Sequence, residues 1–206
     1  MINKPFSESS EQNKQPILSV IKQWFTKPDA TIFEIGSGTG QHACYFPKFL
    51  TELFWQPSDT AENIPGIEAW CAETQLCNVY SPYILDVKQA SWPIESSDYV
   101  FSANTVHIMG WSEVEAMFNG IRKILKPDGI FCLYGPFNYN NQYTSPSNAQ
   151  FDQWLKSRDS KSAIRDFEAL CELGQCPSKY TPLKLVQDHK MPANNRILVF
   201  QSIEPE

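Results

Sequence analysis

Three closely spaced glycines behind an acidic residue form the segment of the chain that is most typical of a ligand site. The segment follows an apolar, β-branched run that predicts a buried strand, and it reads Glu34-Ile35-Gly36-Ser37-Gly38-Thr39-Gly40. Glycines let the backbone turn sharply and let a ligand lie against bare main chain. A triphosphate-binding loop needs lysine at position 41 and the dinucleotide fingerprint needs glycine there, but the residue is Gln41. Because the carboxylate of Glu34 would also repel a pyrophosphate, the segment predicts a cationic ligand without phosphate.

Polar residues after the next three predicted strands complete this expected site. Asp59 lies nineteen residues after Gly40, just beyond the second strand, where a carboxylate accepts both hydroxyls of a ribose. Asp86, beside the end of the third strand, is placed to accept from an exocyclic amine, and Asn104 follows the fourth strand. Adenosine, a positive charge and no phosphate together describe S-adenosylmethionine. The expected cofactor contacts are therefore those of Glu34, Gly36, Ser37, Gly38, Gly40, Asp59, Asp86 and Asn104.

His107 is the titratable side chain of the loop after the fourth predicted strand, next to the expected methyl donor. Its ordinary pKa of about 6.5 suits a general base, and the alternative is a histidine that only hydrogen-bonds its own loop. Methyl transfer from a sulfonium is an in-line displacement in which proximity and alignment supply much of the catalysis. The loop after this strand lacks the N/D-P-P-Y/F string that is typical of enzymes that methylate nucleic acid bases, so we expect no nucleic acid substrate. It also lacks a cluster of carboxylates that could hold a metal, so we expect no metal.

Further candidates for substrate contacts lie on loops of the same sheet edge and on the N-terminal arm. They are Asn13, Trp111, Tyr139, Arg165, Asn194 and Asn195. Each has a structural alternative, because an arginine can form internal ion pairs, asparagines can satisfy a tight turn, and loop aromatics can pack a lid. We expect the substrate to be a small molecule or a protein side chain.

Alternating strands and helices must position these residues. Apolar runs predict strands at 31–35, 53–56, 83–87, 99–103, 130–134, 183–186 and 196–200, and a loop at 189–195 joins the last two. Helical periodicity predicts helices at 16–25, 64–74, 112–125, 149–158 and 166–173, and another helix after the glycine loop. Pro16 suits a first turn, Pro47 must kink or end its helix, and Ser112 with Glu115 matches a capping box.

This order of elements predicts a Rossmann-like, doubly wound α/β fold. Its sheet should have seven mostly parallel strands, end in an antiparallel hairpin and carry helices on both faces, with a small helical cap. Ligands of such sheets bind at the carboxyl ends of the strands. We expect one domain over 1–206, with an N-terminal arm and helix at 1–27 and a cap insertion at 138–166.

Composition narrows the class of protein. The chain has 206 residues and a net charge of −6, which argues against a protein that binds a phosphate backbone. The six cysteines contain no C-x-x-C pair and the three histidines are scattered, so no zinc site is expected. Positions 1–16 are mostly polar and contain no apolar core, and no apolar run approaches about 20 residues, so we expect no signal peptide, no membrane contact and a cytoplasmic location.

The segment Phe33–His42 together with Asp59 resembles the class I S-adenosylmethionine-dependent methyltransferases. The chain is more similar still to a methyltransferase-like family of unknown function found in bacteria and animals. The strings that carry this resemblance include Trp55-Gln56-Pro57-Ser58-Asp59, Asn104-x-x-His107-Ile108, Pro146-Ser147-Asn148 and Met191-Pro192-Ala193-Asn194-Asn195. The family implies the fold and the cofactor but no substrate. Two alternatives stay open: a non-catalytic protein that binds the cofactor as a sensor, and an NAD-dependent oxidoreductase, against which Glu34 and Gln41 argue.

Overall fold

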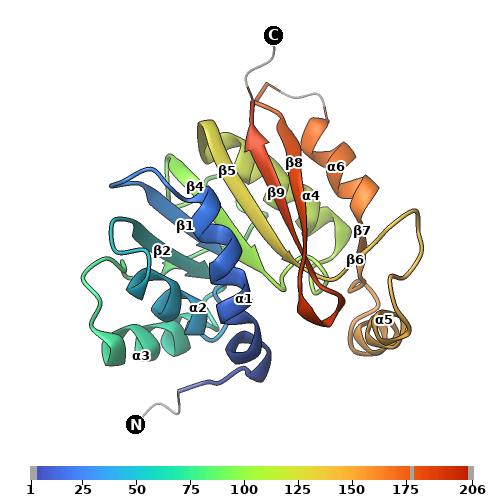
Figure 1. The fold of residues 1–206 in the computed structure, drawn as a ribbon, viewed down its shortest axis with the longest axis horizontal. Coiled ribbons are helices and arrows are strands. Elements are labelled where there is room, and N and C mark those ends of the chain that lie inside the picture. Colours follow the sequence, from blue (N-terminus) through green and yellow to red (C-terminus); the bar gives the residue numbers. More distant parts are fainter. Residues whose placement is uncertain (1–3, 177–178, 204–206) are drawn as a thin grey trace.

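The computed structural model describes residues 4–176 and 179–203. Within them a twisted sheet of seven strands has the order β3-β2-β1-β4-β5-β9-β8 (Figure 1). Its strands are β1 (Thr31–Ile35), β2 (Phe54–Asp59), β3 (Tyr83–Ile84), β4 (Ser97–Ala103), β5 (Leu125–Gly135), β8 (Leu183–Lys190) and β9 (Arg196–Ser202). Neighbouring strands are parallel except in the pairs β5–β9 and β8–β9, which are antiparallel. The predicted α/β sheet with an antiparallel end is confirmed.

Helices pack on both faces of this sheet. They are α1 (Glu8–Trp24), α2 (Gln41–Tyr45), α3 (Ile64–Thr74), α4 (Trp111–Ile124), α5 (Pro146–Arg158) and α6 (Phe167–Gln175), with 3-10 turns η1 (Phe46–Lys48) and η2 (Pro192–Asn194). A small second sheet pairs β6 (Phe137–Asn138) with β7 (Arg165–Asp166). Figure 1 shows α1 in front of the sheet, and α5 beside the loop between β8 and β9. As predicted, Pro47 ends the helix that follows the glycine loop, because α2 gives way to η1 there.

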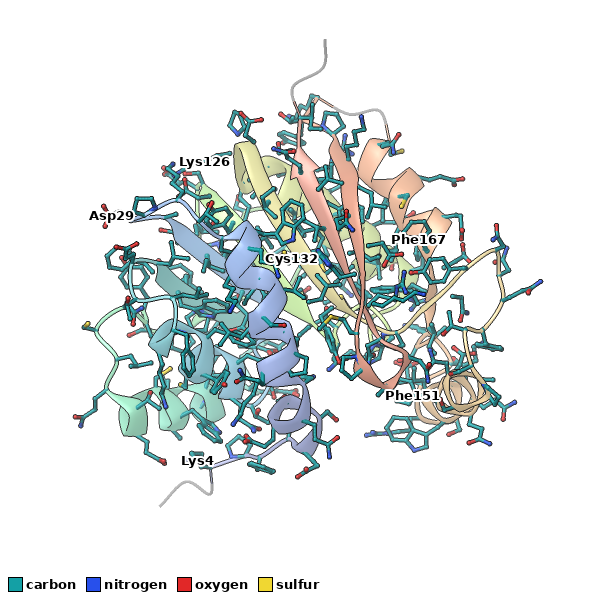
Figure 2. All side chains as sticks on the ribbon, viewed as in Figure 1. Lys4, Asp29, Lys126, Cys132, Phe151 and Phe167 are labelled. Carbon is teal, nitrogen blue, oxygen red and sulfur yellow. The ribbon has the colours of Figure 1, made fainter. Side chains whose placement is uncertain are left out.

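The core is divided between the two faces because alternate residues of each strand point to opposite sides. Phe101 of β4 belongs to the same buried cluster as Ile17 and Ile21 of α1. Its neighbour Val100 belongs to the cluster that contains Met117 of α4. Figure 2 shows side chains on both sides of the sheet. A shift of one residue would move each apolar set to the opposite face, where it would meet the wrong helices, so packing on both faces fixes the register of the strands.

The register brings four loops to one edge of the sheet. Ile35, the last residue of β1, pairs with Ser58, and Ser58 in turn pairs with Tyr83 of β3. On the other side of β1, Glu34 pairs with Phe101 of β4. The carboxyl ends of β1 to β4 therefore lie side by side, and the order of the strands reverses between β1 and β4. Ligands of open α/β sheets bind at this switch point.

Helix α1 begins at Glu8, so the expectation that Pro16 occupies the first turn is wrong. Ser7 caps the helix, because its hydroxyl accepts from the backbone nitrogen of Ser10 at 3.2 Å. Pro16 lies inside the helix and costs it one backbone hydrogen bond. The first half of the helix is polar because much of it lines a cavity instead of the core. The apolar periodicity that predicted the helix therefore does not extend over these residues.

The capping box of α4 is formed by Gly110 and Glu113, so the expected pair of Ser112 and Glu115 is wrong. The backbone nitrogen of Gly110 donates to Oε2 of Glu113 at 2.7 Å, and the nitrogen of Glu113 donates to the Gly110 carbonyl oxygen at 3.0 Å. The helix begins one residue earlier than predicted, at Trp111. In this box the carbonyl oxygen of Gly110 takes the place of the Ser or Thr hydroxyl, because glycine has no side chain that could accept from Glu113.

Several strand lengths also differ from the prediction, and β5 begins at Leu125 although this strand was predicted over 130–134. Strand β8 extends to Lys190, which places His189 in the strand and not in the following loop. Strand β3 has only two residues, because after Ile84 the backbone nitrogen of Leu85 makes a last bond to the carbonyl oxygen of Asp59 and the chain turns away.

Candidate functional site

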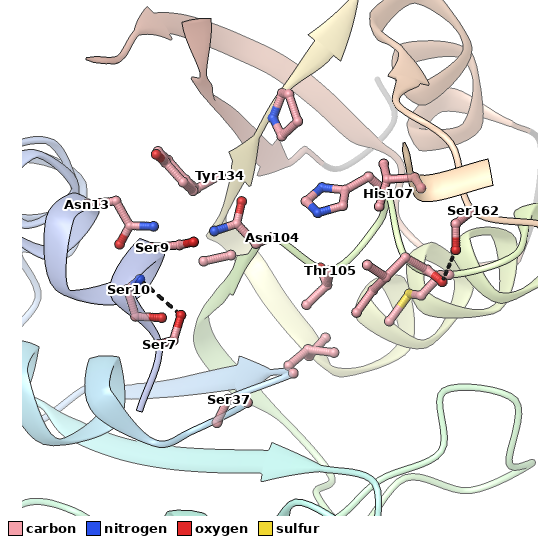
Figure 3. Close-up of a pocket in the computed structure, with 18 of the residues that line it drawn as sticks. Ser7, Ser9, Ser10, Asn13, Ser37, Asn104, Thr105, His107, Tyr134 and Ser162 are labelled. Atoms are coloured by element: carbon pink, nitrogen blue, oxygen red, sulfur yellow. Dashed lines mark hydrogen bonds between the residues drawn. The ribbon is translucent and has the colours of Figure 1, made fainter. Parts of the chain in front are cut away.

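One cavity of about 1270 Å³ opens at the carboxyl edge of the sheet. The loops after β1, β2, β3 and β4 form one half of its wall. The first turns of α1, the inner face of α5 and the loop between β8 and β9 form the other half. Figure 3 shows the residues of α1 opposite those of the loop after β4. A volume of this size holds a nucleoside-sized ligand together with a second small molecule.

The glycine loop after β1 is shaped by close packing at its two ends. At Gly36, with a φ of +75°, an added Cβ would lie 2.4 Å from Cγ2 of Thr105. At Gly40, with a φ of +89°, it would lie 2.9 Å from Cα of Ile67 in α3. Gly38 differs, because nothing lies within 4 Å of its Cβ position and the residue lines the cavity. The middle of the loop therefore presents bare main chain to the open space.

Asp59, the last residue of β2, fixes this loop. Its Oδ2 accepts from the backbone nitrogen of Gly38 at 2.6 Å. Its Oδ1 accepts from the backbone nitrogen of Thr60 at 2.7 Å and from Nδ2 of Asn63 at 2.9 Å. Asp59 and Asn63 both line the cavity. An ionised carboxylate has about four acceptor positions, so Oδ2 has room for a ligand hydroxyl.

Glu34 lies behind the loop and does not line the cavity. Its carboxyl group is buried, and its Oε2 accepts from Nε1 of Trp55 and from Oγ of Ser37, each at 2.8 Å. Burial raises the pKa of Glu34 to about 7, against the lowering effect of these two donors. Glu34 is therefore partly protonated near neutral pH. Its hydrogen bonds to Trp55 and Ser37 support the loop from beneath.

Asp86 and Asn104 lie on opposite sides of the glycine loop and both line the cavity. Asp86 is exposed, and its Oδ1 accepts from the backbone nitrogen of Lys88 at 2.9 Å. Asn104 has a φ of +59°, a left-handed conformation that asparagine tolerates well. Its backbone nitrogen donates to the carbonyl oxygen of Tyr134, which holds the turn after β4 against β5.

His107 lines the cavity from the loop after β4 (Figure 3). The residue is 5% exposed, and its Nδ1 is buried without a hydrogen-bond partner among the described residues. Phe151 of α5 meets the ring edge-on, with 5.3 Å between centroids. Burial, with a smaller contribution from the charge of Arg165, lowers the pKa of His107 to about 4. The ring is therefore neutral at pH 7 and keeps a nitrogen lone pair available.

Arg165 holds the loop that carries His107 and does not line the cavity. Its Nε donates to the carbonyl oxygen of Val106 at 3.0 Å, and its Nη2 donates to those of Met109 and Lys161. The guanidinium thus ties the loop after β4 to the segment that leads from α5 to β7. Arg165 therefore has a structural role, which was the alternative to a substrate contact. Its partners are backbone carbonyl oxygens and not the carboxylates of internal ion pairs.

Asn13 lines the cavity from α1 and contacts His42 of α2. Its Oδ1 lies 2.7 Å from Nε2 of His42. Burial lowers the pKa of His42 to about 4, so the ring is neutral and its Nε2 donates to the amide oxygen. This pair anchors the first turns of α1 over the glycine loop.

The remaining predicted substrate residues divide into two groups. Asn195 lines the cavity, and its Nδ2 donates to the carbonyl oxygen of Pro192 at 3.2 Å. Three others do not line it. Trp111 is the first residue of α4, Tyr139 donates to Asp188 at 2.8 Å, and Asn194 donates to Ser147 at 3.3 Å.

The sequence reasoning missed several residues that line the cavity. Those from α1 are Ser9, Ser10 and Gln12, and those from α5 are Phe151, Trp154, Leu155 and Arg158. The α5 positions are spaced i, i+3, i+4 and i+7, which places them on one face of a helix. That spacing was visible in the sequence, but nothing local indicates that this face turns toward the sheet edge.

The described part of the chain offers neither a metal site nor a membrane span. Across 4–176 and 179–203, no group of three or more His, Cys, Asp or Glu side chains is placed to hold a metal ion. No helix in the same ranges is long and apolar enough to span a bilayer.

Several solved structures with the same fold are described as methyltransferases. An O-methyltransferase family protein from Burkholderia thailandensis is 13% identical, with a TM-score of 0.80, over 97% of this chain and 59% of that chain. The apo form of the S-adenosylmethionine-dependent methyltransferase SibL is 16% identical, with a TM-score of 0.74, over 95% and 56%. An O-methyltransferase family 2 protein from Planctomyces limnophilus in complex with apigenin is 12% identical, with a TM-score of 0.73, over 87% and 52%. The chain spans a little over half of the length of each.

At these identities the likeness establishes the fold, and the family is established by the sequence itself. A family model matches residues 4–202, which is nearly the whole chain. The chain belongs to the family described as "Protein of unknown function (DUF938)".

Proposed function

We propose that the protein is an S-adenosylmethionine-dependent methyltransferase that acts on a small molecule without a metal. The observation that carries this proposal is the cavity itself, which joins the bare main chain at Gly38, the carboxylates of Asp59 and Asp86, and the side chain of His107. The solved structures with this fold add support, because their descriptions name methyltransferases, one of them dependent on S-adenosylmethionine and one bound to apigenin.

The residues around the glycine loop fit the cofactor. Gly38 leaves space for a ligand against its backbone, and Oδ2 of Asp59 has room for one ribose hydroxyl. Asp86 is an exposed acceptor for the exocyclic amine, and Asn104 lines the cavity from the loop after β4. When bound, the cofactor supplies a methyl group on a sulfonium, whose carbon–sulfur bond breaks as the acceptor atom attacks.

The role that we assign to His107 is to take a proton from the acceptor, or to orient it by a hydrogen bond. The ring is already neutral at pH 7, so no proton must leave it first. Phe151 and the carbonyl contacts of Arg165 keep the ring in place. These contacts allow the residue to act without reorientation, as general acid–base catalysis requires.

Titration with S-adenosylhomocysteine, the demethylated cofactor, tests the proposal. At about 100 times its dissociation constant, such a ligand stabilises the fold by about 2.7 kcal/mol. In a domain of this size this raises the melting temperature by roughly 5–10 °C. We expect this shift with S-adenosylhomocysteine and no comparable shift with NAD. Stabilisation by NAD alone would favour an oxidoreductase, and tight cofactor binding without transfer to any acceptor would favour a sensor.

A further inference from the structure

The face of α5 that lines the cavity consists of aromatic rings and ends in a guanidinium. Phe151, Trp154 and Arg158 all line the cavity, and Leu155 between them is buried beneath. The side chain of Trp154 is large and apolar, yet it is 49% exposed. An exposed indole on the wall of a cavity offers a flat surface that a ligand can cover.

These side chains follow one another from the buried end of the cavity to its mouth. The ring of His107 lies 5.3 Å from that of Phe151, and Phe151 stacks on Trp154 with centroids 5.7 Å apart. Cζ of Arg158 lies 4.8 Å from the indole centroid of Trp154. His107 is the innermost member, with a buried Nδ1 that has no partner in the described ranges. A polar, buried end and a charged, exposed end are thus joined by aromatic surface.

The charge of Arg158 is available to a ligand. Within residues 4–176 and 179–203 it has no carboxylate oxygen within 4 Å, whereas the other cavity cation, Lys88, pairs with Glu113 at 2.9 Å. The adjacent Asp159 accepts from the backbone nitrogen of Lys161. A guanidinium whose Cζ lies over an indole still has N–H groups that can donate to a planar anion.

The other charges of the cavity favour an anion with a single charge. The acidic residues on its wall are Asp59, Asp86, Glu113 and Asp159. A phosphate carries nearly two negative charges at neutral pH and would be repelled more strongly than a carboxylate. The planar carboxylate also matches the planar guanidinium.

We propose that this half of the cavity binds a planar aromatic carboxylate, with its ring against Phe151 and Trp154 and its carboxylate on Arg158. The opposite end of the molecule then points toward His107, where the methyl acceptor belongs. The assignment of that end as the acceptor rests on the proposed function, whereas recognition of the carboxylate by Arg158 does not.

Calorimetric titration with a matched pair of ligands tests the proposal. The probes are 4-hydroxycinnamate and its neutral amide, added to the protein with and without saturating S-adenosylhomocysteine. We expect the carboxylate to bind at least tenfold more tightly than the amide. Arg158→Gln should abolish this preference, and Trp154→Leu should weaken both ligands. Lys22→Gln, which removes an exposed cation of α1 away from the cavity, should leave the preference unchanged.

Equal binding of acid and amide, a preference that survives Arg158→Gln, or no binding of either probe would overturn the proposal. Binding of S-adenosylhomocysteine to Arg158→Gln confirms that the variant is folded. Failure of the wild-type protein to bind S-adenosylhomocysteine would instead overturn the proposed function, and the titrations without it would still report on Arg158.

Discussion

The backbone nitrogen of Gly38 lies 2.6 Å from Oδ2 of Asp59. This hydrogen bond joins the loop after β1 to the end of β2, so the carboxylate that we assign to the ribose also sets the shape of the loop. The sequence predicted the position of Asp59 as a ligand contact but not this bond to the loop. Changes at Asp59 should therefore affect both affinity and stability.

Replacement of Asp59 should separate these two effects. In Asp59→Ala the Gly38 nitrogen loses its partner, and we expect the free energy of unfolding to fall by about 1–3 kcal/mol and the affinity for S-adenosylhomocysteine to fall at least tenfold. Asp59→Asn keeps an oxygen for Gly38 and should recover most of the stability but not the affinity. Urea unfolding and calorimetry measure the two quantities, with Asp128→Asn in the exposed first part of β5, away from the cavity, as the control. Unchanged affinity in Asp59→Ala would place the ribose contact elsewhere.

Two glycines of the same loop form a matched pair. Gly38→Ala places a Cβ in open space at a φ of +56°, and we expect a loss of about 1–2 kcal/mol from the left-handed conformation alone. Gly40→Ala adds a contact of 2.9 Å with the backbone of Ile67, so its loss should exceed that of Gly38→Ala by about 1–3 kcal/mol. Urea unfolding of both variants gives the comparison. Equal losses would mean that α3 yields freely at this contact.

Glu34 should make stability depend on pH. Its folded pKa of about 7 lies above its ordinary value, so the folded state binds the proton more tightly than the unfolded state. The contribution of Glu34 is thus full below pH 4.5 and is lost as the pH rises toward 7, with a slope of up to about 1.4 kcal/mol per pH unit. Glu34→Gln, which keeps an acceptor for Trp55 and Ser37, should remove this slope. Parallel pH dependences of the two proteins, measured by urea unfolding at pH 5, 6 and 7, would contradict the shift.

His107 should stay neutral through the physiological range. Because its pKa is about 4, the histidine signals of His107 in NMR spectra should not titrate between pH 6 and 8. If it acts as the base, the methyl transfer rate should be independent of this group above pH 6 and should fall only as the pH approaches 4. His107→Asn should then slow transfer by about 10²–10⁴-fold while binding of S-adenosylhomocysteine is kept. A variant that loses affinity or stability in place of rate would assign His107 a structural role.

The sequence predicted the parts of this protein that depend on local pattern. Helix α3 occupies the predicted residues 64–74, and the apolar runs mark the central strands of the sheet. The N-terminal helix was predicted too short, because residues 8–15 are polar where they face a cavity and a partner helix. The N-cap of α4 was predicted at Ser112 because Ser112 and Glu115 have the S-x-x-E spacing of a capping box. The N-cap is Gly110, and Glu113 is the acidic residue three positions after it.

The residues of the cavity likewise divide into those that a local sequence pattern predicts and those that it does not. The glycine loop, Asp59, Asp86 and Asn104 follow their strands directly, so the topology alone brings them together. The inner face of α5 reaches the cavity only because residues 137–166 fold back across the sheet edge, held by pairing of β6 with β7 and by Arg165. No local pattern encodes that return, so Arg158 is not among the site residues predicted from the sequence.

The place of β9 between β5 and β8 has a consequence for how the chain folds during synthesis. Strands β1 to β5 leave the ribosome long before Arg196–Ser202, so β5 stays an open sheet edge until the last strand arrives. An unpaired edge of this length invites pairing with other chains. Because β9 must insert between two strands already made, its docking closes the sheet in one late step. A nascent chain halted before residue 196 should thus be more prone to aggregation than one released after residue 202.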